Sequence, residues 1–128
     1  MAPLIYLDTH VVVWLYTGHV DRLSKKARRL IEDDAELMIS PMVVLELQYL
    51  HEIERLAVGG RDIVHGLATQ IGLQTCRLPF PDVIDAAIDQ GWTRDPFDRL
   101  IVAQAVAAAS PLLTKDAIIR RHCKLARW

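Results

Sequence analysis

Short apolar runs alternate along the chain with longer amphipathic segments. The runs predict buried strands at residues 4–7, 37–39, 73–78 and 111–114, with a last edge strand at 124–128. The segments between them predict helices over residues 11–16, 25–35, 41–58, 62–71, 81–90, 96–109 and 117–123. Strands separated by helices favour an α/β domain, with a central, mainly parallel sheet and helices on both faces.

Several helix boundaries carry local signals. Ser40-Pro41 and Asp95-Pro96 each place a capping side chain before a proline at the first helical position. Thr9 is the expected cap of the first helix. Glycines at Gly59-Gly60 and Gly72 are expected to end the helices before them.

Length and composition favour one compact domain spanning residues 1–128. The chain has 128 residues and 52% of them are hydrophobic, which is enough for a real core. With Lys+Arg 15 against Asp+Glu 16, the net charge of -1 predicts no general attraction to polyanions. Any nucleic-acid site must therefore be a local patch.

No targeting or membrane segment is expected. Met1-Ala2-Pro3 carries no basic stretch, and the apolar run Val11–Tyr16 has six residues, whereas a bilayer needs roughly 20. Cys76 and Cys123 form no metal-binding pair of neighbours and are expected as buried thiols. These observations predict a cytoplasmic protein.

Two carboxylates interrupt apolar helix faces. At about 100° per residue, Glu46 falls near the middle of an apolar arc of roughly 200°, made by Met42, Val43, Leu45, Leu47, Tyr49, Leu50, Ile53, Leu56 and Ala57. Asp98 is likewise surrounded by Ile101, Val102, Ala105 and Ala109. A buried, unpaired carboxylate costs several kcal/mol, so each must be neutralised, paired or bound to a cation.

Two further acids follow predicted strands. Asp8 and Asp116 come directly after strands 4–7 and 111–114, at the edge of a parallel sheet where ligands bind. No equally inward set of lysines or arginines is available for Asp8, Glu46, Asp98 and Asp116 together. Four carboxylates without paired histidines or cysteines suit a hard cation such as Mg²⁺ or Mn²⁺.

Each of these acids also has a purely structural interpretation. Asp98 lies three residues after Asp95 and fits a capping box, and Asp95 is explained by its capping role alone. Glu46 fits a neutral or arginine-paired core residue, and Asp116 an ordinary loop acid. His10 fits a packed or solvated residue better than a catalytic base.

Four stretches carry a resemblance to a known family. They are Leu7-Asp8-Thr9-His10-Val11 with Trp14, Val44-Leu45-Glu46-Leu47, Arg94 through Ala105 (RDPFDRLIVAQA), and Leu113-Thr114-Lys115-Asp116. In order and spacing the chain resembles PIN-domain ribonucleases, specifically VapC-type toxins of toxin–antitoxin pairs.

The resemblance implies a divalent-metal endoribonuclease. The family's acidic quartet maps onto Asp8, Glu46, Asp98 and Asp116 as catalytic and metal-binding residues, supported by Thr9, Thr114 and Asp95. It implies an RNA substrate, Mg²⁺ with Mn²⁺ as the alternative, inhibition by a VapB-type antitoxin, and a homodimer. Lys115 stands between Thr114 and Asp116, and no acid follows them in the chain. The resemblance therefore leaves open whether the site binds one metal ion or two.

RNA also requires phosphate contacts. A local basic rim is expected from Arg94, Arg99, Lys115, Arg120 and Arg121, although these fit a solvated face equally well. The cluster from Arg22 to Arg29 fits plain surface or an antitoxin contact better than an RNA path.

Other functions are less well supported by the residues. A Rossmann-type nucleotide site lacks its glycine motif, and an aspartyl phosphotransferase would need a second acid where His10 stands. A non-catalytic PIN-type scaffold that binds RNA or protein is the remaining alternative. Such a scaffold predicts the loss of one or more acids, whereas all four are present.

Overall fold

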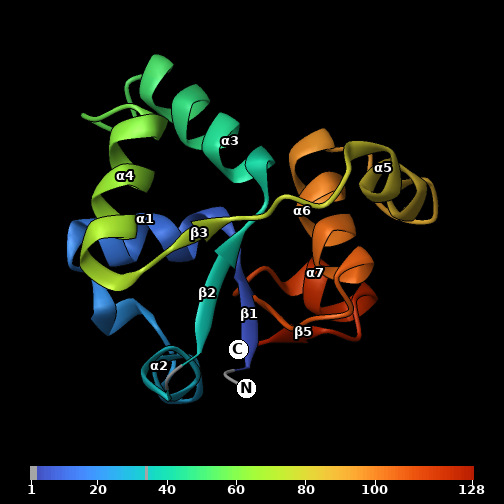
Figure 1. Ribbon diagram of the computed structural model, residues 1–128, viewed down its shortest axis with the longest axis horizontal. Helices are drawn as coiled ribbons and strands as arrows, with labels where there is room; N and C mark the ends of the chain where they lie inside the picture. Colours follow the sequence, from blue (N-terminus) through green and yellow to red (C-terminus); the bar gives the residue numbers. More distant parts are fainter. Residues whose placement is uncertain (1–2, 34) are drawn as a thin grey trace.

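The computed structural model describes residues 3–33 and 35–128, and within them five strands form one parallel sheet (Figure 1). The strands are β1 (Leu4–Leu7), β2 (Glu36–Ile39), β3 (Gln74–Thr75), β4 (Leu112–Leu113) and β5 (Ala126–Arg127), in the order β3-β2-β1-β4-β5. Every pairing between neighbours is parallel. The sheet confirms the expected α/β fold.

Helices cover both faces of this sheet. They are α1 (Thr9–Thr17), the 3₁₀ turn η1 (Val20–Arg22), α2 (Lys25–Glu32), α3 (Pro41–Glu52), α4 (Gly60–Ile71), α5 (Phe80–Ile88), α6 (Pro96–Ala107) and α7 (Ala117–His122). Figure 1 shows α1, α3 and α4 on one side of the strands and α5, α6 and α7 on the other. Right-handed crossovers require this split, because the chain first moves from β1 towards β3 and later from β4 towards β5.

The central strands β1 and β4, and β2 after Glu36, are apolar because both of their faces are covered. Leu7, Ile39 and Leu113 are completely buried or nearly so, and Val12 of α1 and Val102 of α6 pack against the same core. Helix α4 approaches α3 so closely that a Cβ atom at Gly60 would overlap the Val44 carbonyl oxygen. Gly60 therefore permits the α3–α4 contact.

Some predicted boundaries were wrong. Asp8, and not Thr9, caps α1, because its carboxylate accepts the Thr9 amide. The third helix ends at Glu52 instead of Val58, since the chain turns through Glu54 at a φ of 64°. The second ends at Glu32 instead of Ala35, and Asp34, which that prediction included, lies outside the described residues.

The apolar arc predicted on α3 is wider than the buried face. Val43 and Leu47 are buried, but Leu45, Tyr49 and Ile53 are 55%, 46% and 44% exposed. Periodicity identifies apolar positions, and here the number of elements packed around α3 decides which of them are covered.

Both cysteines, Cys76 and Cys123, are buried free thiols, as expected. Among the described residues, no helix is long and apolar enough to cross a membrane. The sequence predicts no targeting segment at Met1-Ala2-Pro3. Of these residues, Met1 and Ala2 lie outside the described residues.

Candidate active site

The candidate site lies at the point of the sheet where the order of the strands reverses. β1 and β4 are neighbours, yet the chain leaves β1 towards β2 on one side and leaves β4 towards β5 on the other. Ligands in open α/β sheets bind at such a switch point, beyond the carboxyl ends of the strands. Asp8 follows β1 there, and Thr114 follows β4.

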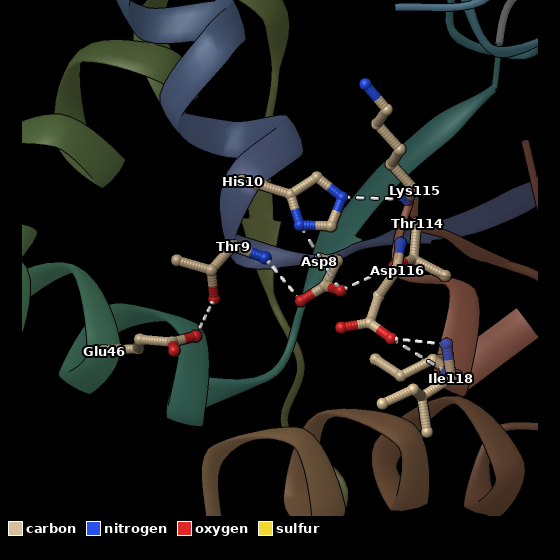
Figure 2. Close-up of polar contacts among 9 residues, drawn as sticks. Asp8, Thr9, His10, Glu46, Thr114, Lys115, Asp116 and Ile118 are labelled. Atoms are coloured by element: carbon tan, nitrogen blue, oxygen red, sulfur yellow. Dashed lines mark hydrogen bonds and ion pairs between the residues drawn. The ribbon is translucent and has the colours of Figure 1, made fainter.

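Asp8 is the most buried of the four acids, with 3% of its surface exposed. Its Oδ1 accepts the Thr9 amide at 2.8 Å and its Oδ2 accepts the Thr114 hydroxyl at 2.7 Å (Figure 2). Both oxygens are thus oriented by short local contacts, which compensate part of the desolvation cost.

Glu46 enters the site from α3. Figure 2 shows it across Thr9 from Asp8, and the Thr9 hydroxyl donates to its Oε1. Burial raises the pKa of Glu46, and the nearby carboxylates of Asp8 and Asp95 add to that effect, although the Thr9 hydrogen bond opposes it. The inward position predicted for Glu46 is therefore correct, and no arginine is paired with it among the described residues.

Asp98 stands in the first turn of α6. Asp95 caps this helix by accepting the amides of Phe97 and Asp98 at 2.8 and 3.1 Å. The capping-box alternative is not formed, because the Asp95 amide donates to Thr93 instead. No described residue donates a hydrogen bond to the Asp98 carboxylate, which remains available to a ligand.

The pKa of Asp98 shows how much negative charge this site concentrates. Burial first, and then the charges of Asp8, Asp95, Asp116 and Glu46, raise the pKa of Asp98 to about 7. A carboxyl group whose pKa is raised close to 7 by burial and by neighbouring carboxylates is common in functional sites. Bringing a cation here would relieve the repulsion.

Asp116 combines a structural and a site position. Its Oδ1 caps α7 by accepting the amides of Ile118 and Ile119, each at 2.9 Å. Its own amide donates to the Thr114 hydroxyl at 3.0 Å, so Thr114 joins Asp116 to Asp8 (Figure 2). The loop-acid interpretation is therefore incomplete, because Asp116 is a helix cap.

His10 packs beside Asp8. Its Nε2 accepts the Lys115 amide at 2.8 Å, and its Nδ1 lies 3.6 Å from Asp8 Oδ2. Burial lowers the pKa of His10, although the carboxylates of Asp8 and Asp116 oppose that effect. Because its Nε2 is already an acceptor, His10 orients the neighbouring loop and does not offer a free base.

The donors present suit a hard divalent cation. Asp8, Glu46, Asp98 and Asp116 offer only oxygens, and His10 does not compensate their charge, because its ring is neutral when Nε2 accepts the Lys115 amide. In residues 3–33 and 35–128, no three His, Cys, Asp or Glu side chains lie close enough together to form a cage that could hold a metal ion. Mg²⁺ requires no such cage, since it commonly uses one or two carboxylates and keeps several waters.

The basic residues expected to bind RNA have different positions. Lys115, Arg120 and Arg121 are exposed, on the loop before α7 and on α7. Arg94 donates to the Gly91 carbonyl, and Arg99 donates to the carbonyls of Ala87 and Ile88 at the end of α5. Arg99 therefore has a clear helix-capping role in the fold.

Replacing Thr114 with valine tests how the site is held together. The variant loses the donor to Asp8 and the acceptor for the Asp116 amide, both at a buried position. We expect its unfolding free energy, measured in urea, to fall by about 1–3 kcal/mol. Thr69→Val, at an exposed helical threonine that bonds only the His65 carbonyl, is the control. Equal losses in the two variants would contradict a special role for Thr114.

Comparison with known proteins agrees with the fold and the sequence motifs. Residues 5–125 match the model of the PIN domain family. The chain is 33% identical over 121 residues to "Ribonuclease VapC22" of Mycobacterium tuberculosis, covering 92% of this chain and 91% of the relative.

Solved structures share the same architecture. VapBC2 from Rickettsia felis, bound to a DNA fragment from its promoter, gives a TM-score of 0.67 at 16% identity, covering 97% of both chains. A toxin–antitoxin complex from Klebsiella pneumoniae gives 0.67 at 15% identity, covering 97% of this chain and 96% of the other. At such identities the likeness concerns the fold alone.

The fold and the acidic site define an α/β domain with carboxylates gathered at its switch point. The chain belongs to the PIN domain family, and its identity to a VapC ribonuclease places it with the VapC-type members of that family.

Proposed function

We propose that this protein is a divalent-metal-dependent endoribonuclease, the toxin of a VapBC-type toxin–antitoxin pair. The observation that carries the proposal is Asp98, a carboxylate without a partner whose pKa is raised to about 7 by burial and by the surrounding carboxylates. The name of the relative that is 33% identical supports ribonuclease activity, and the toxin–antitoxin complexes of the same fold support a VapB-type partner. We place its activity in the cytoplasm, where RNA and such a partner are found together.

In the proposed mechanism the four carboxylates would hold a divalent metal. Asp8 and Asp98 would be its main ligands, with help from Glu46 and Asp116. When bound, Mg²⁺ or Mn²⁺ supplies Lewis acidity towards the phosphate and lowers the pKa of a bound water.

The remaining site residues act by positioning. Thr114 holds Asp8 and the amide of Asp116 in one geometry, and Thr9 links Asp8 to Glu46. Asp95 fixes the first turn of α6, from which Asp98 projects. Among the basic residues, we propose that exposed Lys115, Arg120, Arg121 and Arg94 neutralise RNA phosphates, and that Arg99 contributes less because it caps α5.

Cleavage of RNA tests the proposal directly. Purified, antitoxin-free protein is incubated with total cellular RNA in Mg²⁺, in Mn²⁺ and in EDTA. Discrete fragments that appear with metal and are absent in EDTA are the expected result. Intact RNA with both metals would favour the second candidate, a non-catalytic PIN-type scaffold.

A homodimer is part of the same proposal. Two apolar stripes with a spacing of four residues are exposed, made by Leu45 and Tyr49 of α3 with its C-cap residue Ile53, and by Phe80, Ile84 and Ile88 on α5. Leu45 and Phe80 also line one apolar groove of about 380 Å³. Exposed apolar surface of this extent supports an interface with a second copy.

Replacing Phe80 with aspartate is expected to disrupt that dimer. Phe80 is 62% exposed at the first position of α5, where an acid favours the helix and leaves the fold intact. We expect light scattering after size exclusion to change from dimer to monomer mass. Ile71→Asp, at a 42% exposed residue of α4, should leave the mass unchanged. A dimeric Phe80→Asp variant would place the interface elsewhere.

A further inference from the structure

An aromatic cluster with two cations stands beside Asp8 and Asp116, two of the four carboxylates. The rings of His10 and Trp14 lie 5.1 Å apart between centroids, and Trp128 lies 6.1 Å from Trp14 and 6.3 Å from His10. The Nζ of Lys115 and the Cζ of Arg22 are each 5.9 Å from the Trp14 ring centroid. We call Trp14, His10, Lys115 and Arg22 the Trp14 platform.

The Trp14 platform opens into a shallow cavity that reaches the acidic site at Asp116. This cavity has a volume of about 320 Å³ and is lined by His10, Trp14, Lys115 and Asp116. Asp116 belongs to the acidic site, and His10 lies 3.6 Å from Asp8 Oδ2. A group bound in the cavity is therefore a direct neighbour of any group held by the carboxylates.

The platform has the composition of a site for single-stranded nucleic acid. An indole face stacks on any base, and cations beside it neutralise the phosphates on either side. Lys115 and Arg22 are exposed, and neither is paired with a carboxylate in the part of the chain that the structure describes. A fold-stabilising role would not require two unpaired cations at the same tryptophan.

The neighbours of Trp14 keep the ring in place. His10 is anchored through the Lys115 amide and Asp8, so its ring supports one edge of the indole. Figure 2 shows the Lys115 side chain extending away from Asp116 past His10, and its Nζ lies over the Trp14 ring. A pre-positioned ring loses little freedom when a base stacks on it, which favours binding.

We propose that the Trp14 platform is a nucleobase-stacking subsite, which holds a nucleotide of single-stranded RNA next to the bond to be cleaved. The base stacks with the Trp14 indole, and Lys115 and Arg22 contact neighbouring phosphates. The inference rests on the proposed function for its substrate and deepens it, because it explains how a protein of net charge -1 holds a polyanion. It also changes the interpretation of Arg22, which from the sequence fitted plain surface or an antitoxin contact better than an RNA path.

Binding of RNA without cleavage tests the subsite. The probe is a fluorescein-labelled, mixed-sequence 12-nucleotide RNA in EDTA, and its Kd is measured by anisotropy. Trp14→Leu is expected to weaken binding about thirtyfold, the middle of the range for losing one stacked base. Trp14→Phe keeps a smaller π face and should recover part of this loss, and the melting temperatures of both variants show whether they fold.

Charge removal provides a readout that a structural role does not change. For binding to single strands, the slope of log Kd against log salt decreases by about 0.7 for each phosphate contact removed. We expect that decrease for Lys115→Met and none for Lys26→Met, at an exposed lysine of α2. A folded Trp14→Leu or Trp14→Phe variant that binds like the original protein, or unchanged slope in Lys115→Met, would overturn the subsite. Because no step requires cleavage, that failure is distinct from a failure of ribonuclease activity.

Discussion

Asp98→Asn is expected to lower the rate of RNA cleavage at least about a hundredfold, because metal assistance contributes several kcal/mol and each 1.36 kcal/mol is a factor of ten. Asparagine has nearly the same size and still accepts hydrogen bonds, so α6 keeps its first turn. What it removes is the negative charge with which we propose that Asp98 binds the metal. Initial rates on a fluorogenic RNA at saturating Mg²⁺ measure the effect.

Asp95→Asn is the matched control for this experiment. Asparagine caps helices about as well as aspartate, so the two hydrogen bonds to the start of α6 are retained. If Asp95 acts by positioning, its variant should remain within about tenfold of the original rate, and RNA should stay intact with Asp98→Asn. Equal losses would show that overall negative charge matters, and not the position of Asp98. Cleavage that survives Asp98→Asn would indicate a wrong active site.

The stability of the metal-free protein should fall as pH rises from about 4 to about 7, because of Asp98. Its pKa is about 7 in the folded protein and 3.8 in its ordinary state. Below about pH 4 the carboxyl is protonated in both states and no stability is lost. Between the two values the unfolded chain ionises first, so the free energy of unfolding decreases, and the loss is complete above about pH 7. Glu46, whose pKa is also raised, acts in the same direction.

The difference between the original protein and Asp98→Asn isolates this contribution. In EDTA, Asp98→Asn should melt higher at pH 8, by roughly 3–8 °C after allowance for the partial exposure of the carboxyl, and by less at pH 5. Mg²⁺ at pH 8 should raise the melting temperature of the original protein more than that of the variant. If the melting temperatures of Asp98→Asn and the original protein differ equally at pH 5 and pH 8, the pKa of Asp98 is not raised in the folded protein.

Local sequence signals predicted much of the candidate site. Glu46 and Asp98 were recognised because each interrupts an apolar helix face, and Asp8 because it ends a buried strand. The Asp95-Pro96 signal correctly placed the start of α6. These features depend on neighbours within one or two helical turns, or on strand ends, so they can be read without a partner element.

The same local reasoning does not predict contacts between segments that are distant in the sequence. Thr114 bonds Asp8 across 106 positions, and Lys115 bonds His10 across 105. The pairing of β1 with β4 brings them together. Arg22 and Lys115 likewise meet at Trp14 only in the folded chain, which is why the sequence favoured plain surface or an antitoxin contact for Arg22.

The sequence by itself therefore determined the alternation of strands and helices, the family motifs and the four acids, because these follow from local periodicity and spacing. The tertiary structure decided which apolar residues of α3 are covered, that Asp8 and Asp116 each cap a helix, and that Asp98 lies near enough to the other acids for its pKa to reach about 7. Burial and the interaction of charges depend on distance in space, which the order of residues along a chain does not contain.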